Sequence, residues 1–289
     1  MQRSVLCRLT IASLLVITPL STGLAAWGGQ GHRLVGLIAA DRLTPIARRN
    51  VTWLLERQTL ADVASWADQQ RGDTVQTGLW HYLNIPPDAG GYERDRDCPP
   101  QAGVERGSRG DRWRDCAVDR ILYFEQRTAD TTLDRADRAT ALKYLVHFVG
   151  DLHQPFHALG VGHGGNDITV VVFGSSNCGT DDRPSPCNLH AVWDSRLIGR
   201  RGLEEASYLA ALGKLIGDKH LDARPLGTPA EWAVESWSAA KVALLPSGGA
   251  VDETYYTAQI PVVDERLALA GVRLAAVLNR TLTTPPPTD

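Results

Sequence analysis

Residues 147–157 read His-Phe-Val-Gly-Asp-Leu-His-Gln-Pro-Phe-His, and this run decides how the rest of the chain is interpreted. His147 stands four residues before Asp151, so on a helix the two side chains share one face and lie close enough to hold one cation. An imidazole and a carboxylate are ligands that suit Zn²⁺. Pro155 ends the helix and turns the chain, so His157 is able to face back toward the pair. The run therefore predicts a helix that carries metal ligands and stops in a turn.

The same spacing occurs again at His190 and Asp194. A single histidine, or one such pair, is more often a hydrogen-bonded core or surface feature than a ligand set. Seven of the eight histidines, however, precede residue 191. Two pairs with a third histidine near one of them predict a metal site.

Residues 1–26 have the features of a secretory signal peptide. Arg3 and Arg8 give a positive start, an apolar run covers 9–20, and small residues follow up to Ala26. The apolar run is shorter than the roughly 20 residues of a spanning helix, so we expect cleavage rather than an uncleaved anchor. The mature chain is then expected to begin at Trp27 and to be secreted or periplasmic.

The composition fits one globular domain. Hydrophobic residues make up 43% and charged residues 22% of the 289 residues. The 30 Lys+Arg against 33 Asp+Glu give a net charge of −3, which excludes a strongly basic coat for nucleic acid but not binding by another route. With no linker in sight, we expect a single domain over 27–282 and a flexible Pro/Thr-rich tail over 283–289.

The local signals predict a mainly α fold with long loops. Thr44-Pro45 reads as an N-cap and first helical residue, and Thr228 with Glu231 as a capping box. Pro261 should break or kink the last helix. The β-branched segment 168–173 is expected to contribute to a short β-hairpin. Helices are expected over 46–56, 60–69, 118–126, 133–151, 203–217, 229 to about 245 and 252–282, with loops over about 84–115 and 158–190.

Four cysteines remain once Cys7 leaves with the signal peptide. An even number in an exported chain predicts disulfides, and three pairings are possible. The local pairings are favoured because each would staple a loop rich in Gly, Pro and Asp. They are Cys98–Cys116 and Cys178–Cys187.

Several short blocks follow one another along the chain: Trp27-Gly28-Gly29-Gln30-Gly31-His32, Ala64-Ser65-Trp66-Ala67-Asp68, Trp80-His81-Tyr82, the run 147–157, Gly164-Gly165-Asn166-Asp167 and Asn188-Leu189-His190-Ala191-Val192-Trp193-Asp194. Together they resemble the zinc-dependent single-strand nucleases and 3′-nucleotidases of fungi and plants, the S-one/P-one nuclease family. This family is distantly related to the bacterial zinc phospholipases C. The resemblance implies a helical phospholipase C/nuclease-like fold.

The resemblance also implies three Zn²⁺ ions and their ligands. One ion would be held by Asp68, His81, His147 and Asp151. A second would be held by His157, His190 and Asp194. The third would take the α-amino nitrogen and carbonyl oxygen of Trp27 with His32 and Asp151. The α-amine can be a ligand only after signal cleavage, which makes removal of residues 1–26 part of site assembly.

The resemblance also implies a mechanism. In this family, a hydroxide that bridges two zinc ions attacks the phosphodiester, and the products carry 5′-phosphates. Asp68, Arg71 and Asp151 are the predicted catalytic residues. Arg71 is expected to contact phosphate, since its guanidinium suits that group. Tyr82 is the candidate for stacking a base, and Asn84 stands where some members have Asp. The predicted substrate-binding residues are Arg71, Tyr82, Asn84, Asn166 and Asp167.

The sequence thus predicts a monomeric, secreted zinc endonuclease and 3′-nucleotidase acting on single-stranded DNA and RNA, without stable membrane anchoring. A zinc phospholipase C of the same fold is the alternative. Those relatives typically place Glu where this chain has Asp194, which favours the nuclease. A zinc-storage protein is a further alternative, but the three-ligand ion leaves an open position, as catalytic zinc sites do.

Overall fold

The computed structural model describes residues 27–72, 75–224 and 226–287, so the expected signal peptide lies outside the described residues. The fold is mainly α, as predicted. Its longer helices are α1 (Gly29–Asp41), α2 (Pro45–Leu55), α6 (Ala117–Ala129), α7 (Arg135–His153), α11 (Glu205–Asp218), α12 (Pro229–Ala243) and α13 (Glu253–Thr281). The short helices are α3 (Leu60–Val63), α4 (Val75–Leu79), α5 (Arg94–Asp97), α8 (Gly162–Gly165), α9 (Leu189–Ala191) and α10 (Leu197–Arg200).

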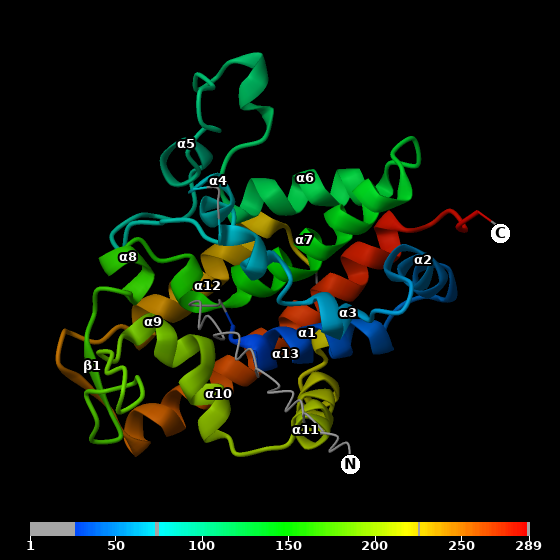
Figure 1. Ribbon diagram of the computed structural model, residues 1–289. Helices are drawn as coiled ribbons and strands as arrows, with labels where there is room; N and C mark the ends of the chain where they lie inside the picture. Colours follow the sequence, from blue (N-terminus) through cyan, green and yellow to red (C-terminus); the bar gives the residue numbers. More distant parts are fainter. Residues whose placement is uncertain (1–26, 73–74, 225, 288–289) are drawn as a thin grey trace, which may run out of the picture.

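Three helices form the centre of the molecule. α1, α7 and α13 cross its middle, with α6 lying along α7 and α1 along α13 (Figure 1). Gly271 lets α13 approach α1, because a Cβ at this position would overlap the side chain of Ile38. Burial of large apolar side chains such as Leu34 and Phe148 contributes roughly 25 cal/mol per Å² of apolar surface removed from water. The packed centre holds α1 and α7 in fixed positions, which matters because both carry candidate ligands.

The predicted helix starts are confirmed. The Thr44 side chain accepts a hydrogen bond from the Ala47 amide, with Pro45 as the first helical residue. Thr228 and Glu231 form the reciprocal capping box at the start of α12. Of the break or kink expected at Pro261, the break does not occur, because α13 runs unbroken through this residue. Packing of its buried residues against α1 and α7 outweighs the loss of one backbone hydrogen bond at the proline.

Two sequence-based expectations are corrected. The strand β1 (Val170–Val172) pairs in parallel with β2 (Gly249–Val251), so this pair is not a β-hairpin. The Gly-Ala-Val of β2 has no β pattern of its own, and the pairing depends on where α12 and α13 bring the chain. The expected helix 60–69 is split into α3 and a 3-10 helix, Ala67–Gly72, which places Asp68 on a separate turn.

Both favoured disulfides are present. Cys98–Cys116 ties the long loop that projects beyond α6 to the start of that helix (Figure 1). Cys178–Cys187 closes the loop between β1 and α9. Within the described residues, none of the helices combines the length and apolar character needed to cross a membrane.

Candidate metal centre

The structure gathers the histidines and aspartates that the sequence singled out into two clusters. The first cluster is His32, Asp68, His81, His147 and Asp151; the second cluster is His157, His190 and Asp194. Their side chains come from α1, the 3-10 helix Ala67–Gly72, the segment after α4, α7, the 3-10 helix Pro155–His157 and the α9 region. Eight residues spread over more than 160 positions therefore meet in one region.

Asp151 is the centre of the first cluster. Its Oδ1 lies 3.3 Å from His32 Nε2, and its Oδ2 lies 2.9 Å from His81 Nδ1 and 3.1 Å from His147 Nε2. The His147 and Asp151 contact is the helical four-residue pair that the sequence predicted. One carboxylate thus has a separate oxygen facing each side of the cluster, a position from which it could bridge two ions.

Three further contacts complete the first cluster. Asp68 Oδ1 lies 3.5 Å from His147 Nε2 and 3.8 Å from His81 Nδ1. The ring of His32 stacks on that of His147, with centroids 4.1 Å apart. This approach needs Gly150, because a Cβ there would stand 2.8 Å from His32 Nδ1. No local pattern singles out Gly150, because its role depends on His32 of the neighbouring helix α1.

The second cluster is built around Asp194. Its Oδ2 lies 3.4 Å from His190 Nε2, and its Oδ1 lies 4.0 Å from His157 Nε2. Asp194 belongs to a π-helical turn, Val192–Arg196, a distortion that is frequent at functional sites. Gln154 was not predicted as a site residue. Its buried Nε2 donates to Asp194 Oδ1 at 2.6 Å, and its side chain caps the turn that carries His157.

Backbone carbonyls orient three of the imidazoles. Nδ1 of His147 donates to the Ala64 carbonyl, Nδ1 of His157 to the His81 carbonyl, and Nδ1 of His190 to the Gly164 carbonyl, at 2.7, 2.8 and 2.7 Å. Each bond fixes the ring and leaves Nε2 facing its cluster. Metal-binding histidines are usually held in this way.

The two partners of the central ion pair have opposite pKa shifts. Burial alone would lower the pKa of His147, but Asp151 and Asp68 outweigh it and raise that pKa to about 10. Burial alone would raise the pKa of Asp151, but His147, His32 and His81 hold it well below its usual value. In the metal-free protein, a proton on His147 therefore supplies positive charge at the place where the carboxylates converge.

Three further histidines of the clusters, His32, His81 and His157, are held neutral. Burial is the main cause that lowers the pKa of His81 to about 4 and that of His157 to about 3. Burial also lowers the pKa of His32, and His147 adds to the effect. For Asp194, burial raises the pKa to about 6 despite the nearby His190. Neutral imidazoles are the form that binds a metal.

The donor set fits divalent metal ions. Among the described residues, several buried side-chain atoms of the clusters make no hydrogen bond: both carboxylate oxygens of Asp68, Asp151 Oδ1, Asp194 Oδ2, His32 Nε2 and His157 Nε2. Buried polar atoms normally have partners, so a group of such acceptors facing one another calls for a shared cation. Imidazole nitrogens with carboxylate oxygens are the set that Zn²⁺ takes.

Trp27 lies two residues before the start of α1, the helix that carries His32 of the first cluster. Its side chain is fully buried, and the following amide, Gly28 N, donates to the Asp194 carbonyl at 2.6 Å. A Cβ on Gly31 would stand 3.0 Å from Trp27 Cβ, so the indole is packed back onto α1. The Trp27 backbone is thereby anchored between α1, which carries His32, and the turn that carries Asp194.

A cavity of about 570 Å³ opens beside the second cluster. His157 and His190 form part of its wall. All five residues predicted to bind substrate line it: Arg71, Tyr82, Asn84, Asn166 and Asp167. Arg71 Nε also lies 3.5 Å from Asp68 Oδ1, which connects the cavity wall to the first cluster. The cavity therefore combines a cation, an aromatic ring and amide groups next to the candidate ligands.

Three histidines lie outside both clusters. His153 is buried on α7, where Nδ1 donates to the Val149 carbonyl and Nε2 lies 3.0 Å from Arg273 Nη1. His163 is exposed on the cavity rim and pairs with Asp167. His220 is exposed in the turn after α11. None of the three belongs to a group of converging metal-ligand side chains among the described residues.

Comparisons with known proteins converge on one family. A family model described as S1/P1 Nuclease matches residues 27–283. Nuclease P1 of Penicillium citrinum is 30% identical over 288 residues, covering 88% of this chain and 97% of the relative. Endonuclease 2 of Arabidopsis thaliana is 30% identical over 88% of this chain and 90% of its own length. Nuclease S1 of Aspergillus oryzae is 28% identical over 93% of this chain and 95% of its own length.

Proposed function

The chain belongs to the S1/P1 nuclease family, and from that premise we propose that it is a zinc-dependent endonuclease and 3′-nucleotidase. Its substrates are single-stranded DNA, RNA and 3′-nucleotides, and its products carry 5′-phosphates. The observation that carries the proposal is the convergence of eight His and Asp side chains beside a cavity with an arginine and a tyrosine. The two disulfides support action in an oxidising compartment outside the cytoplasm.

We assign three zinc ions to the two clusters. Asp68, His81, His147 and Asp151 hold one, His157, His190 and Asp194 another, and Asp151 with His32 and the backbone of Trp27 the third. When bound, zinc acts as a Lewis acid and lowers the pKa of water to about 7. Asp151 keeps its charge in the buried site because three histidines surround it. Gln154 holds Asp194 in orientation from the side opposite His190.

The cavity residues orient the substrate. The planar guanidinium of Arg71 is suited to a phosphate, and its contact with Asp68 places it next to the first cluster. Tyr82 is half-buried and lines the cavity wall, and its aromatic ring is the proposed platform for a base. Unpaired bases can enter such a cavity, whereas a duplex keeps its bases stacked inside. Asn84, Asn166 and Asp167 supply hydrogen-bonding groups around the same opening.

The proposed role of Trp27 ties the metal centre to signal cleavage. An α-amine binds metal when it is free and deprotonated, and its ordinary pKa of about 7.7–8.0 allows this near neutral pH. A preceding residue would convert that amine into an amide and remove a ligand. Protein that keeps Ala26 is therefore expected to bind one zinc ion fewer than protein that begins at Trp27, as measured by metal analysis. Equal zinc content and activity in the two forms would contradict the role.

The direct test is hydrolysis by the mature protein before and after metal exchange. Single-stranded DNA, RNA, 3′-AMP and phosphatidylcholine are each incubated with chelator-treated protein and with the same protein reloaded with zinc. We expect hydrolysis of the nucleic acids and of 3′-AMP only after reloading. Hydrolysis of phosphatidylcholine alone would assign the chain to the phospholipase alternative, and bound zinc without any hydrolysis would point to storage.

Replacing Tyr82 with alanine is expected to raise KM for a single-stranded dinucleotide about 5- to 150-fold, since stacking on an aromatic side chain contributes about 1–3 kcal/mol per base. The change in kcat should be smaller, because the ring lies on the cavity wall and does not belong to either metal cluster. Tyr82→Phe is the matched control and should keep KM near its wild-type value. A Tyr82→Ala protein with an unchanged KM would show that the base does not stack there.

A further inference from the structure

The backbone of residues 81–85 is held along two edges. On one side Leu83 N donates to the His157 carbonyl at 2.9 Å, and Ile85 N donates to the Ala158 carbonyl at 3.0 Å. On the other side the Tyr82 carbonyl accepts a hydrogen bond from Ala117 N at 3.1 Å. His81, a proposed ligand, and Tyr82, the proposed base platform, therefore depend on a contact with the beginning of α6.

The side chain of Trp80 also contacts the segment at the beginning of α6. Its Nε1 donates to Asp115 Oδ1 at 2.7 Å, and Asp115 is only 2% exposed. The indole ring meets Tyr144 of α7 edge-on, with ring centroids 5.7 Å apart. Trp80 immediately precedes His81, so the hydrogen bond to Asp115 fixes the direction in which the chain enters the metal centre.

Asp115 is itself held by a buried arginine. Nη2 of Arg120 donates to the same oxygen, Asp115 Oδ1, at 2.5 Å. The Arg120 guanidinium also lies over the Trp80 ring, 4.3 Å from its centroid, and Arg120 is 4% exposed. Asp115, Arg120 and Trp80 thus form a closed triangle in which every pair interacts. Charge-assisted hydrogen bonds in such a buried place are among the stronger ones in proteins.

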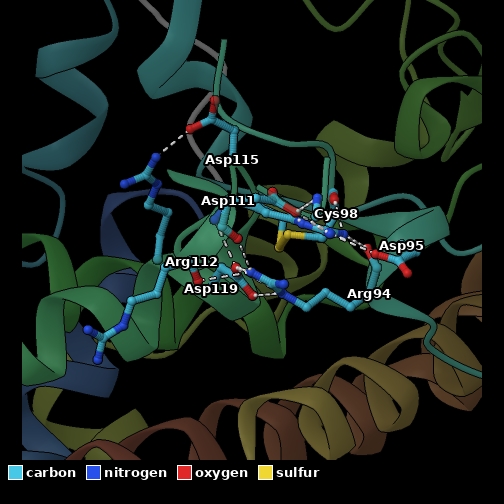
Figure 2. Close-up of polar contacts among 11 residues, drawn as sticks. Arg94, Asp95, Cys98, Asp111, Arg112, Asp115 and Asp119 are labelled. Carbon is cyan, nitrogen blue, oxygen red and sulfur yellow. Dashed lines mark hydrogen bonds and ion pairs between the residues drawn. A yellow bond between two sulfur atoms is a disulfide. The ribbon is translucent and has the colours of Figure 1, made fainter. Parts of the chain in front are cut away.

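The loop over residues 94–119 fixes Asp115 in turn. Asp115 N donates to the Pro99 carbonyl at 3.0 Å, and Cys116, the next residue, is joined to Cys98. Figure 2 shows polar contacts within this loop, among them that of Arg94 with the carboxylate of Asp119. Arg114 binds the carboxylate of Asp111 in the same loop. These contacts and the disulfide hold the loop in place around Asp115.

We infer that Asp115 is a positioning residue, which holds Trp80 and thereby sets the orientation of His81 in the first cluster and of Tyr82 at the cavity. The inference rests on the proposed function, since it assigns the loop a role in assembling that metal centre and substrate site. Among the described residues, the polar contacts of Asp115 are with Trp80, Arg120 and Pro99, and none of these belongs to a cluster or lines the cavity. Its effect is therefore expected to pass through the Trp80 side chain.

Two variants separate this role from a general effect on folding. Asp115→Asn removes the charge that holds Arg120. Trp80→Phe removes the N–H donor together with part of the ring, while the Asp115–Arg120 pair stays. For both variants we expect weaker binding of the zinc ion that His81 would hold. For Asp115→Asn the affinity should fall by about 10-fold, as it does when a metal ligand loses an outer hydrogen-bond partner. KM for a dinucleotide should rise, and kcat should return close to wild type in excess zinc. Zinc affinity is measured by competition with a chromogenic chelator.

Asp111→Asn is the matched control, because Asp111 pairs with Arg114 in the same loop but does not contact Trp80. It should leave zinc affinity and KM unchanged even if it lowers the unfolding temperature. Wild-type zinc affinity and KM in both Asp115→Asn and Trp80→Phe would overturn the inference, and so would an equal loss of zinc affinity in Asp111→Asn. Wild-type protein that binds zinc without hydrolysing any nucleic acid would instead overturn the proposed function. In that case, the zinc affinities of the variants, measured by chelator competition, would still test the positioning role of Asp115.

Discussion

Asp151→Asn is expected to reduce kcat/KM for single-stranded DNA by at least about 1,000-fold, which exceeds the roughly 10- to 100-fold cost of losing an outer partner of a metal ligand. The reason is the position of Asp151, whose two oxygens face His32 on one side and His81 and His147 on the other. Asparagine keeps the shape but loses the negative charge and presents an amide to one of these sides. Two proposed zinc ions lose a shared ligand at once.

Metal analysis should show the same loss independently of activity. We expect the variant to keep the ion of the second cluster, whose ligands are His157, His190 and Asp194 and do not include Asp151. The matched control is Asp137→Asn on the same helix, where the side chain is 55% exposed and lies 3.3 Å from Arg127. That variant should hydrolyse DNA like wild type. Full zinc content and full activity in Asp151→Asn would remove Asp151 from the mechanism.

Zinc affinity is expected to fall as the pH is lowered, with release of protons when zinc binds at pH 7. Asp151 and Asp68 raise the pKa of His147 to about 10 in the metal-free protein, after overcoming the opposite effect of burial. The free form therefore holds a proton at pH 7 that the zinc-bound form cannot hold. His81 and His157, with pKa values lowered to about 4 and about 3, are already neutral and release none.

The direction of this pH dependence follows from the number of protons that each state binds. The metal-free state binds more protons than the metal-bound state, so acid favours the metal-free state, and each released proton costs about 10-fold in affinity per pH unit. Below about pH 6 the dependence should steepen, because burial raises the pKa of Asp194 to about 6. Calorimetry in buffers of different ionisation enthalpy counts the protons. His220→Gln, at an exposed position outside both clusters, should leave the count unchanged, and pH-independent affinity between pH 6 and 8 would contradict the expectation.

The sequence by itself determined the features that depend on neighbouring residues. The four-residue spacings place His147 with Asp151 and His190 with Asp194, because helical geometry brings such residues to one face. The Thr44 cap and the Thr228–Glu231 capping box formed where the side chains predicted them. The local disulfide pairings were also favoured correctly, since each closes a short stretch of chain. The quoted blocks further identified the family.

Other features were decided only by the tertiary structure, because they join segments that are far apart in the chain. α1 was not predicted, yet it carries His32 to the ring of His147, and Gly150 leaves the space that the His32 ring occupies. β1 pairs with β2, which lies about 80 residues later in the chain. Gln154 holds Asp194 across 40 positions, and Asp115 holds Trp80 across 35. No local pattern encodes such contacts: they exist only once the packed helices fix the distance and direction between the side chains.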